Sequence, residues 1–417
     1  MLTMTENDKI ASYINENFTK TSTKERMDKL CRQVSIESPG PRIQDCVFNF
    51  KIPVPDVPPK GARIQVVCAG ACYRMRGRSA STSSTTSNHS NDEIPSHNTS
   101  HYGFRDSSLF PGFEVAGIID AVGEEADGTC FEIGQRVVIY PHDDLPHGYA
   151  EYMIVPDLSY LVPIPDNLPL SVASMLPTGA LLAKSAVMAA TSYVEKLLKE
   201  YSSGHICKIL IVGTGGLALW AIRIAEHQFK SPEFKGRVQI TVASLKDDGF
   251  ILASEIPHVS VVQWNEDLFE KQIVERTQDA CRGLVDVVID FGITSRSLHR
   301  SLQCLNSVSE DETIIKISMF TLNLFYFKGG IVFVSDEVAD RLLPKFSKLI
   351  AEKNQKIEPV TFGSIDVLKQ LVDLVSNGDI IPPPHTEFAA EDATSVVQKL
   401  CKSEIPGRAV LRFHDIE

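Results

Sequence analysis

The chain has 417 residues, of which 43% are hydrophobic and 23% charged, and its formal net charge is −12. This length and composition predict a globular α/β protein with two domains and a substantial core. The negative charge argues against general affinity for nucleic acid or for an anionic membrane surface.

Three features of the sequence bear on where the protein is found. Residues 1–20 are mostly polar and contain no secretion signal. The apolar run at residues 313–334 carries Lys316, Lys328 and two glycines, which indicates buried strands rather than a membrane span. The nine cysteines are scattered and odd in number, which indicates reduced thiols rather than a disulfide framework. We therefore expect a cytoplasmic protein.

The first hundred residues change character twice. Residues 1–45 are polar, and we assign this N-terminal extension no function. Residues 47–71 are typical of short strands separated by prolines. Residues 79–101 consist mostly of Ser, Thr, Asn and His, and so few apolar side chains cannot offset the loss of conformational entropy on ordering. We predict a disordered insertion there.

The next segments indicate a small, mainly antiparallel β domain. β-Branched residues alternate between glycine turns in residues 110–123, 131–139 and 148–152. The proline-rich segment Pro163–Pro169 then marks a boundary.

Beyond that boundary, strands and helices alternate, which is typical of a doubly wound parallel sheet. We expect strands at 209–212, 238–243, 259–263 and 285–289, and helices at 172–190, 193–201, 217–225 and 268–276. The last sixty residues contain an extended segment at 359–362, a helix at 364–374 and a strand at 408–413.

The stretch with the clearest chemistry follows the first of these strands. Gly213, Gly215 and Ala218 give the spacing G-x-G-x-x-A between a buried strand and an apolar helix. The first glycine permits a tight turn, and the second lets backbone approach a pyrophosphate. The small third residue allows the helix, with its positive N-terminus, to pack close to the strand. In this context the triplet predicts a dinucleotide site.

Four blocks in the sequence carry a family resemblance. Pro111–Gly117 (PGFEVAG) with Gly134–Val138 (GQRVV), Gly148–Tyr152 (GYAEY) and Gly407–Leu411 (GRAVL) resemble blocks of the medium-chain dehydrogenase/reductase superfamily, in family order. The resemblance implies a Rossmann domain inserted in a GroES-like β domain, with an active-site cleft between them. We assign residues 46–170 and 359–417 to the GroES-like domain and 171–358 to the Rossmann domain.

Only one of the three zinc ligands of the family is retained. Cys72 matches the first ligand position, but the next two fall on Phe113 and Pro177, whose side chains cannot bind a metal. The four-cysteine lobe of structural zinc is also absent, and Arg74 replaces the hydroxyl that relays protons. We therefore expect no zinc.

The same segment is similar to the quinone reductase branch of the family. Cys72–Gly77 keeps the tyrosine and the glycine of that branch's motif but lacks its acidic residue. In that branch the cofactor delivers hydride and the protein orients the acceptor. Tyr73 is the candidate catalytic residue, because its hydroxyl could donate to a developing enolate oxygen.

The end of the second Rossmann strand bears on the cofactor. An acidic residue there would favour NAD, whereas Ser244 followed by Lys246 suits a 2′-phosphate, so we expect NADP (NADPH). Asp247 and Asp248 weaken this preference, since either acid could pair with Lys246 or repel phosphate. The full set of candidate cofactor-binding residues is Gly213, Thr214, Gly215, Gly216, Leu217, Ser244, Lys246, Phe291, Gly292 and Thr178.

The leading hypothesis is therefore an NADP(H)-dependent, zinc-independent oxidoreductase that reduces an enone, a quinone or a related carbonyl compound. Two alternatives stay open: a catalytically silent nucleotide-binding sensor or scaffold, and a zinc alcohol dehydrogenase with atypical ligands. The expected partner is a small-molecule substrate, without nucleic acid or membrane. The resemblance also implies a homodimer, for which the apolar run at 314–327 could supply an edge strand.

Overall fold

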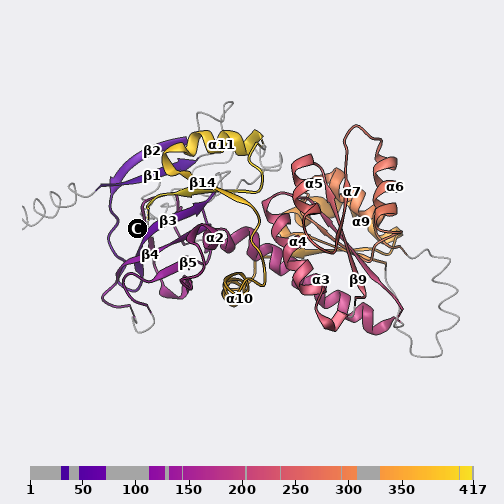
Figure 1. Ribbon diagram of the computed structural model, residues 1–417, viewed down its shortest axis with the longest axis horizontal. Coiled ribbons are helices and arrows are strands. Elements are labelled where there is room, and N and C mark those ends of the chain that lie inside the picture. Colours follow the sequence, from indigo (N-terminus) through magenta and orange to yellow (C-terminus); the bar gives the residue numbers. More distant parts are fainter. Residues whose placement is uncertain are drawn as a thin grey trace, which may run out of the picture.

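The computed structural model describes residues 30–36, 47–71, 112–126, 131–142, 144–201, 204–234, 236–292, 294–307, 329–402 and 404–415. The elements form two lobes, each built on its own sheet (Figure 1). Tyr73, the predicted insertion at 79–101 and the apolar run at 314–327 lie outside these residues.

One lobe contains a six-stranded parallel sheet of order β10-β9-β8-β11-β12-β13. Its central strands are apolar and buried on both faces, as expected for a sheet covered by helices on each side. This confirms the predicted doubly wound architecture. The strands are β8 (Cys207–Val212), β9 (Val238–Ser244), β10 (Val259–Gln263), β11 (Val287–Asp290), β12 (Ile331–Ser335) and β13 (Lys356–Val360).

Helices cover this sheet in the right-hand lobe of Figure 1. α4 follows β8 and lies against α3, while α6 contacts α7. The helices are α3 (Leu181–Glu200), α4 (Gly216–Phe229), α5 (Asp247–Ser254), α6 (Glu270–Ala280), α7 (Ser295–Cys304) and α9 (Asp336–Glu352). A further helix, α10 (Ile365–Ser376), packs on α3 between the lobes.

The other lobe contains a mixed, mainly antiparallel sheet of order β14-β15-β3-β4-β5-β7, and β6 also pairs with β3. Only β14 and β15 run parallel. This is the small β domain that the glycine-punctuated segments predict. Its elements are β3 (Ala62–Gly70), β4 (Val115–Val122), β5 (Arg136–Ile139), β6 (Tyr152–Val155), β7 (Leu161–Pro163), β14 (His385–Ala389), β15 (Arg408–Arg412) and α11 (Ala393–Lys402).

The junction between the lobes is helical. We expected helices at 172–190 and 193–201, but the chain forms α2 (Leu170–Ser174), one π-helical turn called η5 (Leu176–Ala180), and the continuous helix α3. Pro177 has no N–H to donate to the preceding turn, so the α-helical ladder is interrupted there. The Leu181 N–H donates to the Leu176 carbonyl five residues back, which widens the turn.

Two segments lie differently from the predicted domain limits. The limit at residue 358 falls inside β13, which pairs with β12 and belongs to the parallel sheet. Residues 30–36, within the predicted N-terminal extension, form β1 (Leu30–Ile36), which pairs with β2 (Val47–Pro53). The Val34 N–H donates to the Tyr149 carbonyl at 2.7 Å, so β1 packs on the β domain. The sequence did not reveal this strand, because the surrounding residues are polar and its contact with the β domain, at Tyr149, is distant in sequence.

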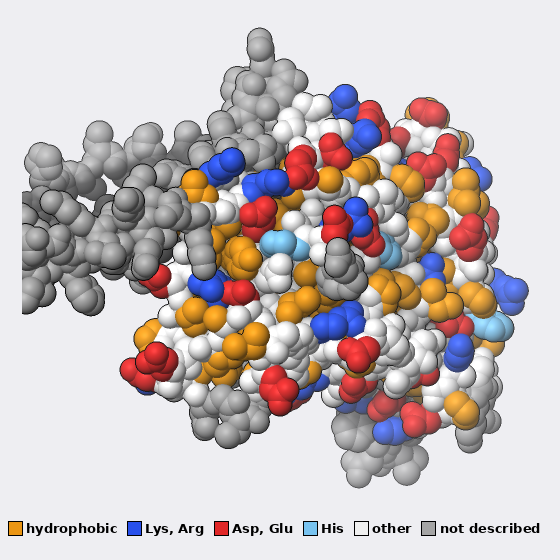
Figure 2. Space-filling view, turned by 60° about the vertical axis from the view of Figure 1, so that its left-hand side comes forward, with side chains coloured by type: hydrophobic (Ala, Val, Ile, Leu, Met, Phe, Trp, Pro, Cys, Tyr) orange, Lys and Arg blue, Asp and Glu red, His pale blue; other side chains and the backbone are white. Residues whose placement is uncertain are grey.

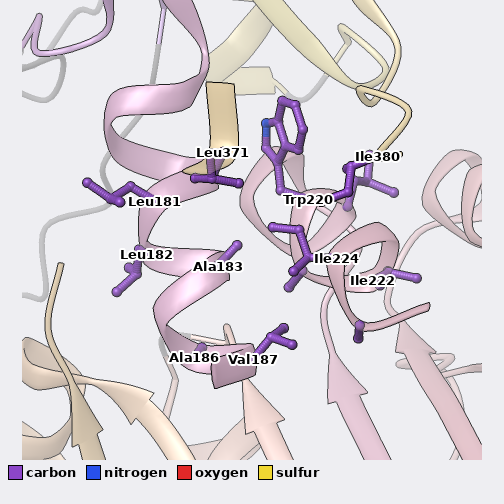
Figure 3. Packing of buried hydrophobic residues seen from close by; sticks show 14 of the residues in the cluster. Leu181, Leu182, Ala183, Ala186, Val187, Trp220, Ile222, Ile224, Leu371 and Ile380 are labelled. Carbon is purple, nitrogen blue, oxygen red and sulfur yellow. The ribbon is translucent and has the colours of Figure 1, made fainter. Parts of the chain in front are cut away.

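The largest cluster of buried residues extends from α4 to α3 and α10 (Figure 3). The Trp220 ring of α4 is fully buried, and it packs in the same cluster as Leu371 of α10. Small residues such as Ala183 let α3 and α4 approach closely. This packing fixes α4, and with it the glycine loop at its N-terminus.

The surface is mixed in character. On the face drawn in Figure 2, acidic and basic side chains are interspersed among apolar ones, with no large area of one charge. Among the described helices, none is both long and apolar enough to cross a membrane.

Candidate dinucleotide site

The glycine loop lies where the sequence predicts it, between the end of β8 and the start of α4. Gly213 has a φ of 113°, a left-handed conformation that side chains disfavour, and its N–H donates to the Ala243 carbonyl at 2.9 Å. Gly215 caps α4, and no atom lies within 4 Å of the place where its Cβ would be. The space on the Cβ side of Gly215 is therefore open, as a phosphate-binding loop requires.

The end of β11 lies beside this loop. The Phe291 N–H donates to the Val212 carbonyl at 3.0 Å, and the Phe291 Cβ is 3.6 Å from the place of a Cβ on Gly213. Gly292 follows, and its N–H donates to the Asp290 carboxylate at 2.7 Å. The structure thus brings the predicted Phe291 and Gly292 to the glycine loop, at the carboxyl ends of neighbouring strands.

Ser244, at the end of β9, is joined to the loop through Thr214. Their hydroxyl oxygens are 2.7 Å apart, and the Ser244 hydroxyl donates to the Lys246 carbonyl at 2.9 Å. Ser244 is fully buried, whereas the Lys246 side chain is exposed. The Asp247 carboxylate accepts a hydrogen bond from the Gln263 side-chain amide. Lys246 is thus the exposed cation at this end of the site.

A buried ion pair of the β domain, which sequence reasoning missed, lies against the glycine loop of the other lobe. Glu114, just before β4, pairs with Arg408 at the start of β15, and both side chains are almost fully buried. The Glu114 carboxylate also accepts from the Thr178 hydroxyl and from the Gly179 N–H at 3.2 Å. The predicted Thr178 is therefore held by Glu114, at the lobe junction.

Three glycines make room for the Glu114–Arg408 pair. A Cβ on Gly70 would lie 2.2 Å from the Glu114 carboxylate, and a Cβ on Gly216 would lie 2.2 Å from Arg408 Cδ. A Cβ on Gly179 would be 3.3 Å from the Arg408 guanidinium. Arg408 therefore crosses the first residue of α4, directly beside the phosphate-binding turn. Glu114 and Arg408 belong to the PGFEVAG and GRAVL blocks, so these two blocks were the sequence signal from which the pair could have been predicted.

The remaining predicted residues are placed as follows. Leu217, in the first turn of α4, is partly buried against the core. Tyr73 lies outside the described residues, so the structure does not place it. Within the described ranges, no group of three or more His, Cys, Asp or Glu side chains could hold a metal ion.

The fold and this site define a two-domain protein with a GroES-like β domain and a Rossmann domain. The alcohol dehydrogenase GroES-like domain model matches residues 59–166. A zinc-type alcohol dehydrogenase-like protein of Schizosaccharomyces pombe is 22% identical over 327 residues, which is 73% of this chain and 82% of that protein.

Two solved structures are similar in fold. Acetophenone reductase from Geotrichum candidum, solved in complex with NAD, has a TM-score of 0.58 and 18% identity and covers 93% of this chain and 99% of its own. The quinone oxidoreductase from Coxiella burnetii has a TM-score of 0.58 and 17% identity and covers 93% and 100%. Residues 59–166 thus match an alcohol dehydrogenase GroES-like domain, and the chain shares its fold with these oxidoreductases over most of its length.

Proposed function

We propose that the protein is an NADP(H)-dependent, zinc-independent reductase of an enone, a quinone or a related carbonyl compound. The observation that carries the proposal is the open glycine turn at the N-terminus of α4 with the Arg408 side chain beside it. Backbone N–H groups, a helix dipole and a guanidinium together favour a pyrophosphate.

The nucleotide's adenosine end bears on the choice of NADP. The end of β9 carries no acidic residue, which leaves a ribose 2′-hydroxyl without a carboxylate acceptor. Lys246 is exposed there, and the Asp247 carboxylate is engaged by Gln263. This arrangement supports recognition of a 2′-phosphate by Lys246, with Ser244 fixing the turn through Thr214 and the Lys246 carbonyl.

The donor set does not suit zinc. Phe113 and Pro177 stand at two of the three ligand positions of the family, and neither side chain has a lone pair to offer. The proposed reaction therefore uses no metal. A bound reduced nicotinamide supplies the hydride in this class of reaction. The chain's part is to hold the nucleotide, orient the acceptor and polarise its carbonyl, for which Tyr73 is our candidate.

One experiment separates the rival functions. Purified protein is titrated with NADPH and with NADH, NADPH oxidation is assayed against a panel of quinones and enones, and bound metal is measured. We expect nucleotide binding and turnover without zinc. Binding without turnover on any acceptor would favour a silent nucleotide-binding protein. Stoichiometric zinc would favour a dehydrogenase with atypical ligands, and no nucleotide binding would overturn the proposal.

Lys246 gives the first testable prediction. Lys246→Ala should raise the dissociation constant of NADPH about 10-fold or more and that of NADH less than about 3-fold. Only NADPH carries the 2′-phosphate that the ammonium would contact. The dissociation constants of both nucleotides, from the fluorescence of the reduced nicotinamide, measure this. Lys230→Ala, an exposed lysine just after α4, is the matched control. Equal loss for NADPH and NADH would contradict the assignment.

Tyr73 gives the second testable prediction. Tyr73→Phe removes only the hydroxyl, so the catalytic constant should fall by about 10–100-fold while the dissociation constant of NADPH stays within about 2-fold. Single-turnover hydride transfer, followed by the loss of nicotinamide absorbance, separates the two effects. An unchanged rate of hydride transfer would assign carbonyl polarisation to another group.

A further inference from the structure

The end of β11 holds a buried carboxylate that the proposed chemistry does not use. Asp290 is 1% exposed and is the last residue of β11, where it pairs with Val212 of β8. Among the described residues, no cation pairs with it. An unpaired buried carboxylate costs stability, so its presence at this position calls for a specific role.

Neutral donors satisfy this carboxylate. The Ser297 hydroxyl donates to it at 2.9 Å, the Ser301 hydroxyl at 2.8 Å and the Gly292 N–H at 2.7 Å. Ser297 and Ser301 are four residues apart on α7, so they present their hydroxyls on one face of that helix. Asp290 therefore connects the turn after β11 to the first turns of α7.

The same hydrogen bonds hold the Phe291–Gly292 turn, which is also restricted by its other neighbours. A Cβ on Gly292 would lie 2.0 Å from the Ser297 hydroxyl, so only glycine fits beneath it. On the other side, Phe291 is bonded to Val212 and lies against Gly213. The Phe291–Gly292 turn is thus enclosed between the Asp290–Ser297–Ser301 cluster and the glycine loop.

We propose that Asp290 is a positioning residue for the dinucleotide: its carboxylate fixes the Phe291–Gly292 turn beside Gly213, and that turn forms one wall of the nucleotide crevice. This inference rests on the proposed function, because it needs a nucleotide in that crevice. Losing the carboxylate frees the turn, and the crevice then has to be ordered when the nucleotide binds.

Asp286 supplies a matched control on the same chain segment. It lies one residue before β11, is 2% exposed, and accepts from the Lys208 N–H at 2.9 Å and the Asn306 side-chain amide at 2.6 Å. Its bonds are at the opposite end of the sheet from the glycine loop. If the role of Asp290 were purely structural, Asp290→Ala would weaken nucleotide binding no more than Asp286→Ala does.

The test compares dissociation constants of NADPH and NADH for the full-length wild type, Asp290→Ala, Asp290→Asn and Asp286→Ala, each at a temperature where circular dichroism shows it folded. We expect Asp290→Ala to weaken both nucleotides about 10-fold, and Asp290→Asn and Asp286→Ala to stay within about 3-fold. Asparagine rescues because its amide can accept from Gly292 and donate to Ser301. Asp290→Ala should lose the same affinity for both nucleotides, whereas Lys246→Ala should lose affinity mainly for NADPH.

Should Asp290→Ala fail to fold, Ser297→Ala with Ser301→Ala tests the same cluster, with an expected loss of about 3–10-fold in both nucleotides. The positioning role would be overturned if Asp290→Ala and the serine double variant bound both nucleotides with wild-type dissociation constants. It would also be overturned if Asp286→Ala lost as much nucleotide affinity as Asp290→Ala. Failure of the wild type to bind either nucleotide would overturn the proposed function itself, and is thereby distinguished from failure of the inference.

Discussion

Arg408→Met is expected to lower the free energy of unfolding by about 3–5 kcal/mol, because Glu114 would stay buried without its cation. Thr178 and Gly179 would still donate to the Glu114 carboxylate, but neutral donors do not balance its charge. Equilibrium unfolding in urea measures the loss. The same variant should bind NADPH and NADH more weakly, since its guanidinium lies beside the first turn of α4.

Two comparisons show whether the loss comes from the buried pair. Arg412, on the same strand, pairs with Glu387 and Asp415 at the surface, so Arg412→Met should cost less than about 1 kcal/mol. The double variant Glu114→Gln with Arg408→Met removes both charges and should recover most of the stability lost in the single variant. It should not recover nucleotide affinity. A single variant as stable as Arg412→Met would contradict the role given to the pair.

The parallel sheet was predictable because each strand is a short apolar run followed by a helical pattern. The strand expected at 259–263 is observed at those residues, and the one expected at 238–243 is one residue longer. Helix ends were less predictable: the helix expected at 268–276 spans Glu270–Ala280. The apolar period fixes the core face of a helix, but residues 277–280 (Thr-Gln-Asp-Ala) extend this helix without a large apolar side chain to mark the period.

The site was predictable only where it is contiguous in sequence. The glycine loop, Phe291 and Gly292 each follow a strand, and parallel strands bring their carboxyl ends together. Glu114, Thr178 and Arg408 come from three distant segments, and their meeting depends on how the two lobes pack. A charged residue also gives no sign in the sequence that it will be buried, since most Glu and Arg side chains are exposed.

The structure changes the role of the Ser244 hydroxyl from binding a phosphate to shaping the turn after β9. The residue type of Ser244 suits a 2′-phosphate, but its hydroxyl is buried and already donates to the Lys246 carbonyl. Its visible role is to tie Thr214 to the end of β9. Direct contact with a 2′-phosphate therefore falls to Lys246 in the proposal, and Ser244 shapes the turn that carries Lys246.

Asp290 gives the second large effect, a dependence of stability on pH. Burial raises the pKa of the Asp290 carboxyl from 3.8 to about 6, although Ser301, Ser297 and Gly292 partly oppose the rise by donating to the charged form. Since the folded-state pKa is the higher one, the contribution of Asp290 to stability is complete below pH 3.8 and is lost as the pH rises through about 6. The loss amounts to about 3 kcal/mol, at 1.36 kcal/mol for each unit of pKa.

Asp290→Asn cannot titrate and should escape this loss. The difference in the free energy of unfolding between Asp290→Asn and the wild type should therefore move by about 3 kcal/mol in favour of the variant between about pH 3.5 and pH 7. Urea unfolding at several pH values measures it, and other titrating groups cancel in the difference. Ser301→Ala removes a donor that opposes the rise, so it should move the wild-type transition to higher pH. A difference that stays constant across this range would mean that Asp290 titrates at an ordinary pKa, as it would if water reached the carboxylate and the turn beside the glycine loop were open.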